Sequence, residues 1–301
     1  MNQPEMNRPS ITGRAWVRVL LFLISYFIVN SLMQVGGIYL ISLFKEMSFT
    51  EYLTSFQEQI SQSNVSLSTL LVIQTSGLIG MLALVTIFRK KVDGRTLVSL
   101  GLSIRGWLRD AAAGLVMGLL LIGIGFLTLF VFGFLTIQSV QFAAGSLALS
   151  LLFFLVVSLN EEIMLRGYVL NNLLEQYHPY NALGVTAFLF SIMHGFNPNI
   201  TMIGFLNIFL AGVLFGIYYI YRRNLWFPIM IHLSWNFFQG PVFGFEVSGL
   251  KSISLITHEV EGPFYLTGGS FGFEGSLLLT LLLLAAIWWI YHRYGESAGT
   301  A

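Results

Sequence analysis

The chain has 301 residues, of which 55% are hydrophobic and only 10% are charged, and its mean hydropathy is +0.77. Soluble globular proteins carry roughly 25% charged residues. This composition therefore excludes an ordinary soluble domain and indicates an integral membrane protein. The formal net charge of +1, with no basic stripe along the chain, gives no sign of a nucleic-acid partner. The absence of cysteine excludes disulfides, thiolate metal ligands and a cysteine nucleophile.

Residues 1–13 are polar, contain Pro4 and Pro9, and are predicted to form a loose cytoplasmic tail before a single membrane domain at 14–301. A helix that crosses the hydrocarbon core needs about 20 apolar residues. The predicted fold class is therefore all-α, a polytopic membrane helix bundle with about eight transmembrane helices. The eight apolar runs are Trp16–Phe44, Leu67–Phe88, Leu108–Leu135, Ser146–Leu174, Ala182–Gly195, Ile203–Tyr221, Trp226–Gly240 and Gly275–Tyr291.

The fifth and seventh runs are short for a full span, and each carries a histidine. Short or interrupted helices are tolerated at membrane depth where they line a cavity within the protein. These two runs are therefore expected beside a functional site. Glycines in the third run are expected to allow close helix packing, as small residues do in membranes. They are Gly114, Gly118, Gly123 and Gly125.

The charges between the runs alternate in sign along the chain. Positive charge precedes the first run, separates the second from the third and the sixth from the seventh, and follows the eighth, whereas the other connections are mainly acidic. By the positive-inside rule, this alternation predicts a multi-pass protein of the cell membrane with both termini cytoplasmic. The long outer connection 241–274 is rich in glycine, phenylalanine and glutamate, and its sequence is compatible with a lid or with a disordered link.

Three charged residues lie inside the fourth run, at Glu161, Glu162 and Arg166. Each charge near the bilayer centre costs on the order of 3 kcal/mol, so such a cluster indicates a functional site. Glu162 and Arg166 are four residues apart and can form an ion pair on one helix face. The side chain of Glu161 points about 100° away from that of Glu162 around the helix axis, so it faces a different direction. The pair is therefore predicted to be a structural ion pair, and Glu161 to be available for chemistry.

Polar residues also interrupt the two short runs. His194 ends the fifth run, where it shares a helix face with Phe190, and His232 and Asn236 share one face of the seventh. Each residue alone has an ordinary structural reading, because histidine and asparagine side chains commonly hydrogen-bond between membrane helices. Together with a spare carboxylate, they can activate a water molecule and stabilise a tetrahedral oxyanion.

The same residues suit a second kind of site. Glu161, His194 and His232 form a donor set for zinc with an open water position. No His-Glu-x-x-His helix occurs, so the common zinc-protease signature is absent. The residues therefore leave both zinc and a metal-free glutamate mechanism open.

The order of these motifs resembles the CAAX prenyl protease and bacteriocin-processing family (CPBP, also called Abi) of intramembrane endopeptidases. The family pattern is Glu-Glu-x-x-x-Arg, then Phe-x-x-x-His, then His-x-x-x-Asn or Asp. The chain matches it with Glu161-Glu162 and Arg166, with Phe190 and His194, and with His232 and Asn236. The resemblance covers about residues 146–245, which it implies to be the catalytic core.

The resemblance implies that Glu161 activates water with help from His194, and that His232 and Asn236 stabilise the oxyanion. It also implies an endopeptidase, either metal-dependent or metal-free, whose substrates are peptides or proteins at the lipid bilayer. CAAX processing is one of several substrate classes in the family. Two alternatives come from the residues and the family. They are a proton-coupled transporter, for which the chain lacks an internal repeat, and a non-catalytic bacteriocin-immunity membrane protein.

Overall fold

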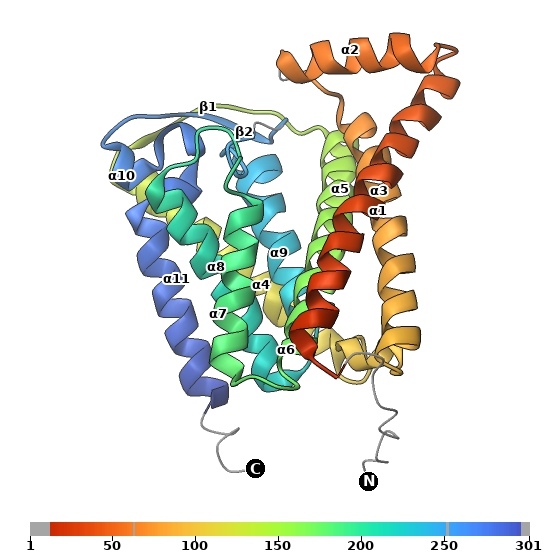
Figure 1. Ribbon diagram of the computed structural model, residues 1–301. Coiled ribbons are helices and arrows are strands. Elements are labelled where there is room, and N and C mark those ends of the chain that lie inside the picture. The colour runs from red at the N-terminus through yellow and green to blue at the C-terminus, as the bar shows by residue number, and fades with distance from the viewer. Residues whose placement is uncertain (1–12, 63, 251–252, 296–301) are drawn as a thin grey trace.

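A computed structural model describes residues 13–62, 64–250 and 253–295. All of the predicted tail except Gly13 lies outside these residues. The structure confirms the all-α membrane bundle (Figure 1). Within the described residues, six helical segments are long and apolar enough to cross a membrane: Ala15–Phe44, Leu67–Val92, Trp107–Val131, Ala144–Leu173, Met202–Arg222 and Leu277–Gly295.

These segments contain α1 (Ala15–Phe44), α3 (Leu67–Ile87), α4 (Trp107–Val131), α5 (Ala144–Glu162) with α6 (Asn171–Leu173), α8 (Met202–Arg222) and α11 (Leu277–Ile290). The two short runs form the shorter helices α7 (Pro179–Met193) and α9 (Trp226–Phe237). All eight predicted runs are therefore helical, and the two expected to be short are short. The third run was expected to continue to Leu135, but α4 ends at Val131 because the chain turns at Gly133, whose φ of 75° favours glycine.

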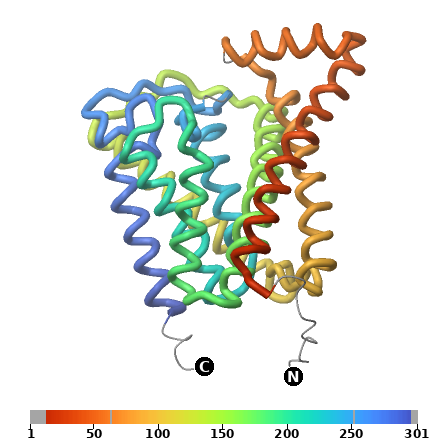
Figure 2. Tube along the Cα trace, in the orientation of Figure 1, coloured from red at the N-terminus to blue at the C-terminus, as the bar shows by residue number. Residues whose placement is uncertain are grey.

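The helices α1 and α3 pack against each other and α3 packs on α5, whereas α7 and α11 pack on α8 (Figures 1 and 2). The α4–α9 contact in the middle depends on two glycines. A Cβ atom at Gly114 would lie 2.5 Å from the Phe227 carbonyl oxygen, and one at Gly118 would lie 2.8 Å from that of Ile231. The predicted close packing therefore holds at these positions. It does not hold at Gly123, where the nearest atoms would be 3.9 Å away.

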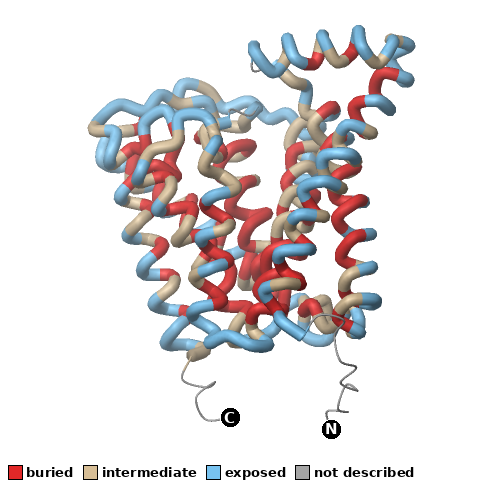
Figure 3. Tube along the Cα trace, viewed as in Figure 1, coloured by how far each residue is buried: buried red, intermediate tan, exposed pale blue. Residues whose placement is uncertain are grey.

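Four helices continue as π-helical segments: η1 (Phe88–Val92) after α3, η3 (Ile163–Leu170) after α5, η4 (Phe238–Val242) after α9 and η7 (Tyr291–Gly295) after α11. Every residue of η3 is buried, and buried positions gather around it in the lower middle of the bundle (Figure 3). A π segment inside an α-helix frequently marks a functional site. This one directly follows Glu161 and Glu162.

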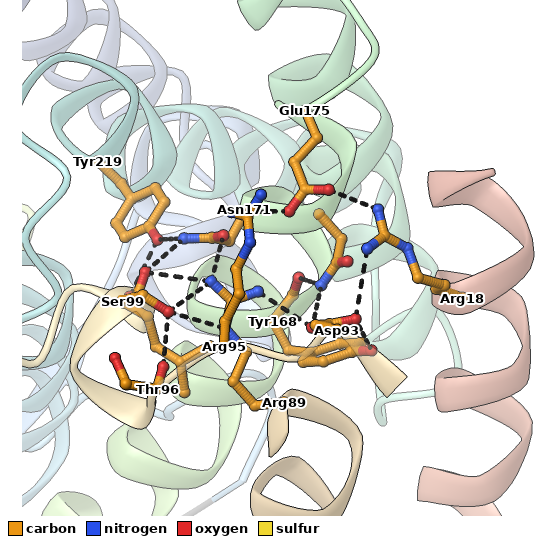
Figure 4. Close-up of polar contacts among 12 residues, drawn as sticks. Arg18, Arg89, Asp93, Arg95, Thr96, Ser99, Tyr168, Asn171, Glu175 and Tyr219 are labelled. Carbon is orange, nitrogen blue, oxygen red and sulfur yellow. Dashed lines mark hydrogen bonds and ion pairs between the residues drawn. The ribbon is translucent and has the colours of Figure 1, made fainter. Parts of the chain in front are cut away.

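A buried polar cluster holds η3 and α6 against α1 and the end of α3 (Figure 4). Asp93 is its centre, and its carboxylate lies 3.5 Å from the Arg18 guanidinium and 3.0 Å from that of Arg89. The Tyr168 hydroxyl and the Asn172 amide also donate to Asp93, each at 3.3 Å. Because Tyr168 and Asn172 belong to the helix that carries Glu161, the cluster fixes the lower end of that helix.

The face opposite the start of α1 carries the elements that the apolar runs did not predict (Figure 1). One is the amphipathic helix α2 (Phe49–Ser61), and another is the antiparallel pair β1 (Leu135–Val140) and β2 (Ile256–Val260). The short elements α10 (Phe264–Thr267), η5 (Gly269–Phe271) and η6 (Phe273–Gly275) also lie there, whereas η2 (Leu97–Leu100) belongs to the connection between α3 and α4 at the opposite face. The described residues of 241–274 therefore form a folded cap on the bundle.

The start of α1 and the end of α11 lie at the same face, opposite the cap (Figure 1). We call it the basic face, because the arginine-rich and lysine-rich connections before α4 and after α8 also lie there. The segregation of charge expected from the sequence is thus present in three dimensions. Which face meets the cytoplasm remains a prediction of the positive-inside rule.

Candidate active site

Four of the predicted site residues come together around one cavity. Glu161 comes from α5, His194 from the end of α7, and His232 and Asn236 from α9. The cavity holds about 490 Å³ of empty space, and residues of α8, η6 and α11 also line it. The two short helices therefore do border a site within the bundle.

Glu162 and Arg166 lie behind this cavity and form a buried ion pair. Arg166 Nη1 is 2.8 Å from Glu162 Oε1, and both side chains are essentially inaccessible to solvent. The guanidinium also donates to the Gly212 carbonyl oxygen at 3.1 Å, and it lies over the rings of Phe190 and Phe215. Such contacts offset part of the cost of removing a charge from water. The pair joins α5 and η3 to α7 and α8.

The same carboxylate orients His232. Its Oε1 accepts the Nδ1–H of His232 at 2.9 Å, and the imidazole stacks on Phe215 with 5.3 Å between ring centres. A carboxylate only accepts hydrogen bonds, so the proton lies on Nδ1 and Nε2 is left to face the cavity. The arrangement is that of an imidazole whose tautomer is fixed by a second residue.

His194 is also held through its Nδ1 atom, here by a backbone carbonyl group. Its Nδ1 lies 2.8 Å from the carbonyl oxygen of Phe190, one helical turn earlier. Because a carbonyl only accepts, Nδ1 carries the proton here too, and Nε2 is free. The two imidazoles therefore present the same unprotonated nitrogen to the cavity when both are neutral.

Glu161 faces both free nitrogens. Its Oε2 lies 3.9 Å from His194 Nε2 and 4.0 Å from His232 Nε2. These separations are too long for direct hydrogen bonds, whereas a water molecule about 2.8 Å from both atoms of either pair would bridge them at an angle of about 90°. Oε2 is buried and has no hydrogen-bond partner among the described residues. A buried oxygen in this state requires water or a ligand.

Asn236 completes the predicted set. Its side chain is buried, lines the cavity, and makes no hydrogen bond to any described residue. The amide is one helical turn beyond His232, so both side chains lie on one face of α9. Its N–H groups are thus available to an oxygen atom that enters the cavity.

The structure adds a carboxylate that the sequence motifs did not point to. Glu274 of η6 lines the same cavity. Its Oε1 accepts the indole N–H of Trp235 at 3.0 Å, and its Oε2 accepts the backbone N–H and the hydroxyl of Ser248 at 2.7 and 2.9 Å. Burial raises the pKa of Glu274, and the donors from Ser248 and Trp235 counteract this. Glu274 thus connects the cap to the helix that carries His232 and Asn236.

The donor set of Glu161, His194 and His232 is of the kind that zinc prefers. Around a tetrahedral zinc ion with bonds of about 2.0–2.1 Å, ligand atoms lie roughly 3.3 Å apart, whereas the nitrogen–oxygen separations here are 3.9 and 4.0 Å. No group of three His, Asp or Glu side chains within the described ranges is arranged to hold a metal ion. As arranged, these residues do not fit bound zinc.

Comparison with known protein families agrees with this geometry. Residues 143–238 match the family described as type II CAAX prenyl endopeptidase Rce1-like. The match confirms the resemblance to CAAX-type proteases, and it contains α5, η3, α7, α8 and α9. Residues 143–238, about a third of the chain, are thus similar to the CAAX-type endopeptidase family, and they lie within a multi-pass membrane protein. No curated protein matches the chain.

Proposed function

We propose that the protein is an intramembrane endopeptidase that hydrolyses peptide bonds of membrane-associated substrates by glutamate-dependent water activation. One observation carries the proposal. The unpartnered Glu161 Oε2 lies 3.9 and 4.0 Å from two imidazole nitrogens whose partner nitrogens are both occupied. This geometry leaves one acceptor site for a water molecule between a carboxylate and two bases.

In the proposed reaction, Glu161 takes a proton from this water with help from His194. The water oxygen then forms a bond to the carbonyl carbon of the peptide. The protonated Glu161 returns the proton to the amide nitrogen as the carbon–nitrogen bond breaks, so the products are an amine and a carboxylic acid, which then ionises. Positioned acid–base groups of this kind typically accelerate such steps by about 10²–10⁴-fold.

The oxyanion would be held by His232 and Asn236. Asn236 has free N–H groups, so it can donate directly. His232 can donate through Nε2 only as an imidazolium that has taken up a second proton from solvent before the water attacks, because its Nδ1 proton is already donated to Glu162. The proposal therefore assigns Glu162 two roles: it balances Arg166, and it stabilises the positive charge that His232 carries when the oxyanion forms.

The test is the variant Glu161→Gln, assayed as purified full-length protein against a peptide library and compared with wild type. We expect turnover to fall by about 10²–10⁴-fold. Folding should be unchanged, because Oε2 makes no protein hydrogen bond that the amide would lose. Glu175→Gln is a matched control, since the Glu175 side chain has the same 20% exposure but lies in the cluster of Figure 4, away from the cavity.

Cleavage by Glu161→Gln at the wild-type rate would refute the assignment of Glu161 as the residue that activates water. If neither protein cleaves any peptide, the non-catalytic immunity role is favoured. Proton-linked uptake into liposomes that is lost in Glu161→Gln, without proteolysis, favours the transporter. Comparison of the peptides released from membranes with and without active protein identifies the substrate and tests whether it is a CAAX-type sequence.

The metal question has its own measurement. Because the site is wider than a tetrahedral zinc site, we expect treatment with a chelator, followed by elemental analysis, to leave turnover within about twofold of the untreated enzyme. A loss of turnover that added zinc restores would show that His194 and His232 close around a metal ion in solution.

A further inference from the structure

A second cavity opens at the basic face, away from the active site. It lies between the start of α4, the end of α8 and η7, and it holds about 850 Å³ of empty space. Three arginines from these three elements line it, together with one acid and three tyrosines. The residues used below are Arg109, Arg222, Arg293, Asp110, Tyr218 and Tyr294.

The charge of this cavity is unbalanced. Arg109, Arg222 and Arg293 have no carboxylate oxygen within 4.0 Å in the described part of the chain, whereas the buried Arg18, Arg89 and Arg166 each have at least one. The single acid, Asp110, is buried and accepts the hydroxyl proton of Tyr218 at 2.6 Å. Three positive charges against one negative charge leave a surplus of two.

The arginines are also held near the cavity by an aromatic ring. Arg222 and Arg293 lie 5.9 and 5.6 Å from the ring centre of Tyr294, within the range of cation–π contacts. Tyr294 in turn packs edge-on against the buried Tyr218. Guanidinium groups bind phosphate oxygens through paired hydrogen bonds. A cavity that the described residues line with three such groups and a single acid is thus suited to a phosphate.

The position of the cavity defines the source of that phosphate. It lies at the ends of membrane-spanning helices, where exposed aromatic residues mark the depth of lipid headgroups. Trp288 and Trp289 on α11 are 63% and 47% exposed, and Leu108 on α4 is 67% exposed. A phospholipid can place its headgroup in the cavity and its acyl chains along these apolar side chains, whereas a free phosphate ion makes no contact with them.

We infer that this cavity binds the phosphate headgroup of an anionic membrane phospholipid, through Arg109, Arg222 and Arg293. Clusters of arginine and lysine at the membrane surface attract such lipids electrostatically. The inference is independent of the proposed proteolysis, because it concerns a different cavity on a different face.

The experiment measures binding of a fluorescent phosphatidylglycerol to the full-length protein in neutral detergent, with inorganic phosphate and phosphatidylcholine as competitors. The cavity variant is Arg109→Gln/Arg222→Gln/Arg293→Gln. The control variant, Lys90→Gln/Lys91→Gln/Arg105→Gln, removes the same charge from exposed residues of the same face outside the cavity. We expect the cavity variant to bind on the order of tenfold more weakly or worse, and the control to stay within about twofold of wild type.

If both variants lose the same amount of lipid binding, the inference is wrong, because general surface charge would then explain the binding. If inorganic phosphate displaces the fluorescent phosphatidylglycerol at the same concentration as unlabelled phosphatidylglycerol does, the cavity is a site for free anions instead. Equal competition by phosphatidylcholine would remove the need for anionic charge. All three arginines are exposed, so the single variants Arg109→Gln, Arg222→Gln and Arg293→Gln are expected to fold, and each should weaken binding by a smaller factor.

Discussion

Glu274 allows a sharp test of how the cap supports the active site. Both of its oxygens accept a buried N–H group, Oε1 from Trp235 and Oε2 from Ser248. In Glu274→Gln, one oxygen is replaced by an NH₂ group, so one of the two donors loses its acceptor and faces another donor. An unsatisfied buried group costs about 1–3 kcal/mol. We expect the free energy of unfolding to fall by about 2 kcal/mol.

The measurement is unfolding of the purified protein in mixed micelles by titration with sodium dodecyl sulfate, followed by circular dichroism. Glu259→Gln is the control, because Glu259 is exposed on β2 and accepts only the amide of Gln138. A change of less than about 0.5 kcal/mol is expected there. Equal stability of Glu274→Gln and wild type would refute the view that this carboxylate joins the cap to α9.

The effect of pH follows from the raised pKa of Glu274. A carboxyl group whose pKa is higher in the folded than in the unfolded state contributes stability below its ordinary value of 4.5, and this contribution is lost as the pH rises through the folded value. The stability difference between wild type and Glu274→Gln should therefore be largest at or below pH 4.5 and decrease above it. A difference that grows with rising pH would contradict this sign.

Two further predictions concern the scaffold. Asp93→Asn should destabilise the protein by about 3–5 kcal/mol in the same titration, because it removes the buried acid that Arg18 and Arg89 share. Glu175→Gln should cost about 1 kcal/mol or less, because Glu175 and its partner Arg95 are partly exposed and its buried partner Arg18 keeps Asp93. Equal losses would count against the burial argument. Gly118→Ala should lower the free energy of unfolding by about 1–3 kcal/mol and lower turnover, because the added methyl group pushes α9 away from α4. Gly123→Ala on the same helix should leave stability unchanged or raise it slightly. The reverse order would show that α4 and α9 do not pack as described.

Much of the transmembrane part was predictable because the bilayer imposes simple requirements on length and composition. The eight apolar runs, the two short ones and the packing glycines Gly114 and Gly118 follow from these requirements. The positions of Glu161, His194 and His232 around one cavity required the resemblance to a family as well, because spacing along the chain does not fix which helices are neighbours.

The elements outside the bilayer were harder to predict. α2 had a usable local signal, since Ser48 and Glu51 form a capping box and Tyr52 and Phe56 are four residues apart on its buried face. The pairing of β1 with β2 joins segments more than a hundred residues apart, and no local pattern specifies that contact. Glu274 was missed for the same reason: in sequence it is one acid before an apolar run, and only the fold of the cap brings it beside Trp235.

Two successive segments of the chain line the cavity of the candidate active site. The residues proposed to carry out hydrolysis belong to the segment 143–238 that matches the family, whereas Ser248 and Glu274 follow that segment. Exchange of residues 239–276 between related chains would therefore alter which side chains a substrate meets while leaving the proposed hydrolytic groups in place. Substitutions in the cap could thus change which substrates fit without altering the buried charges of the segment 143–238.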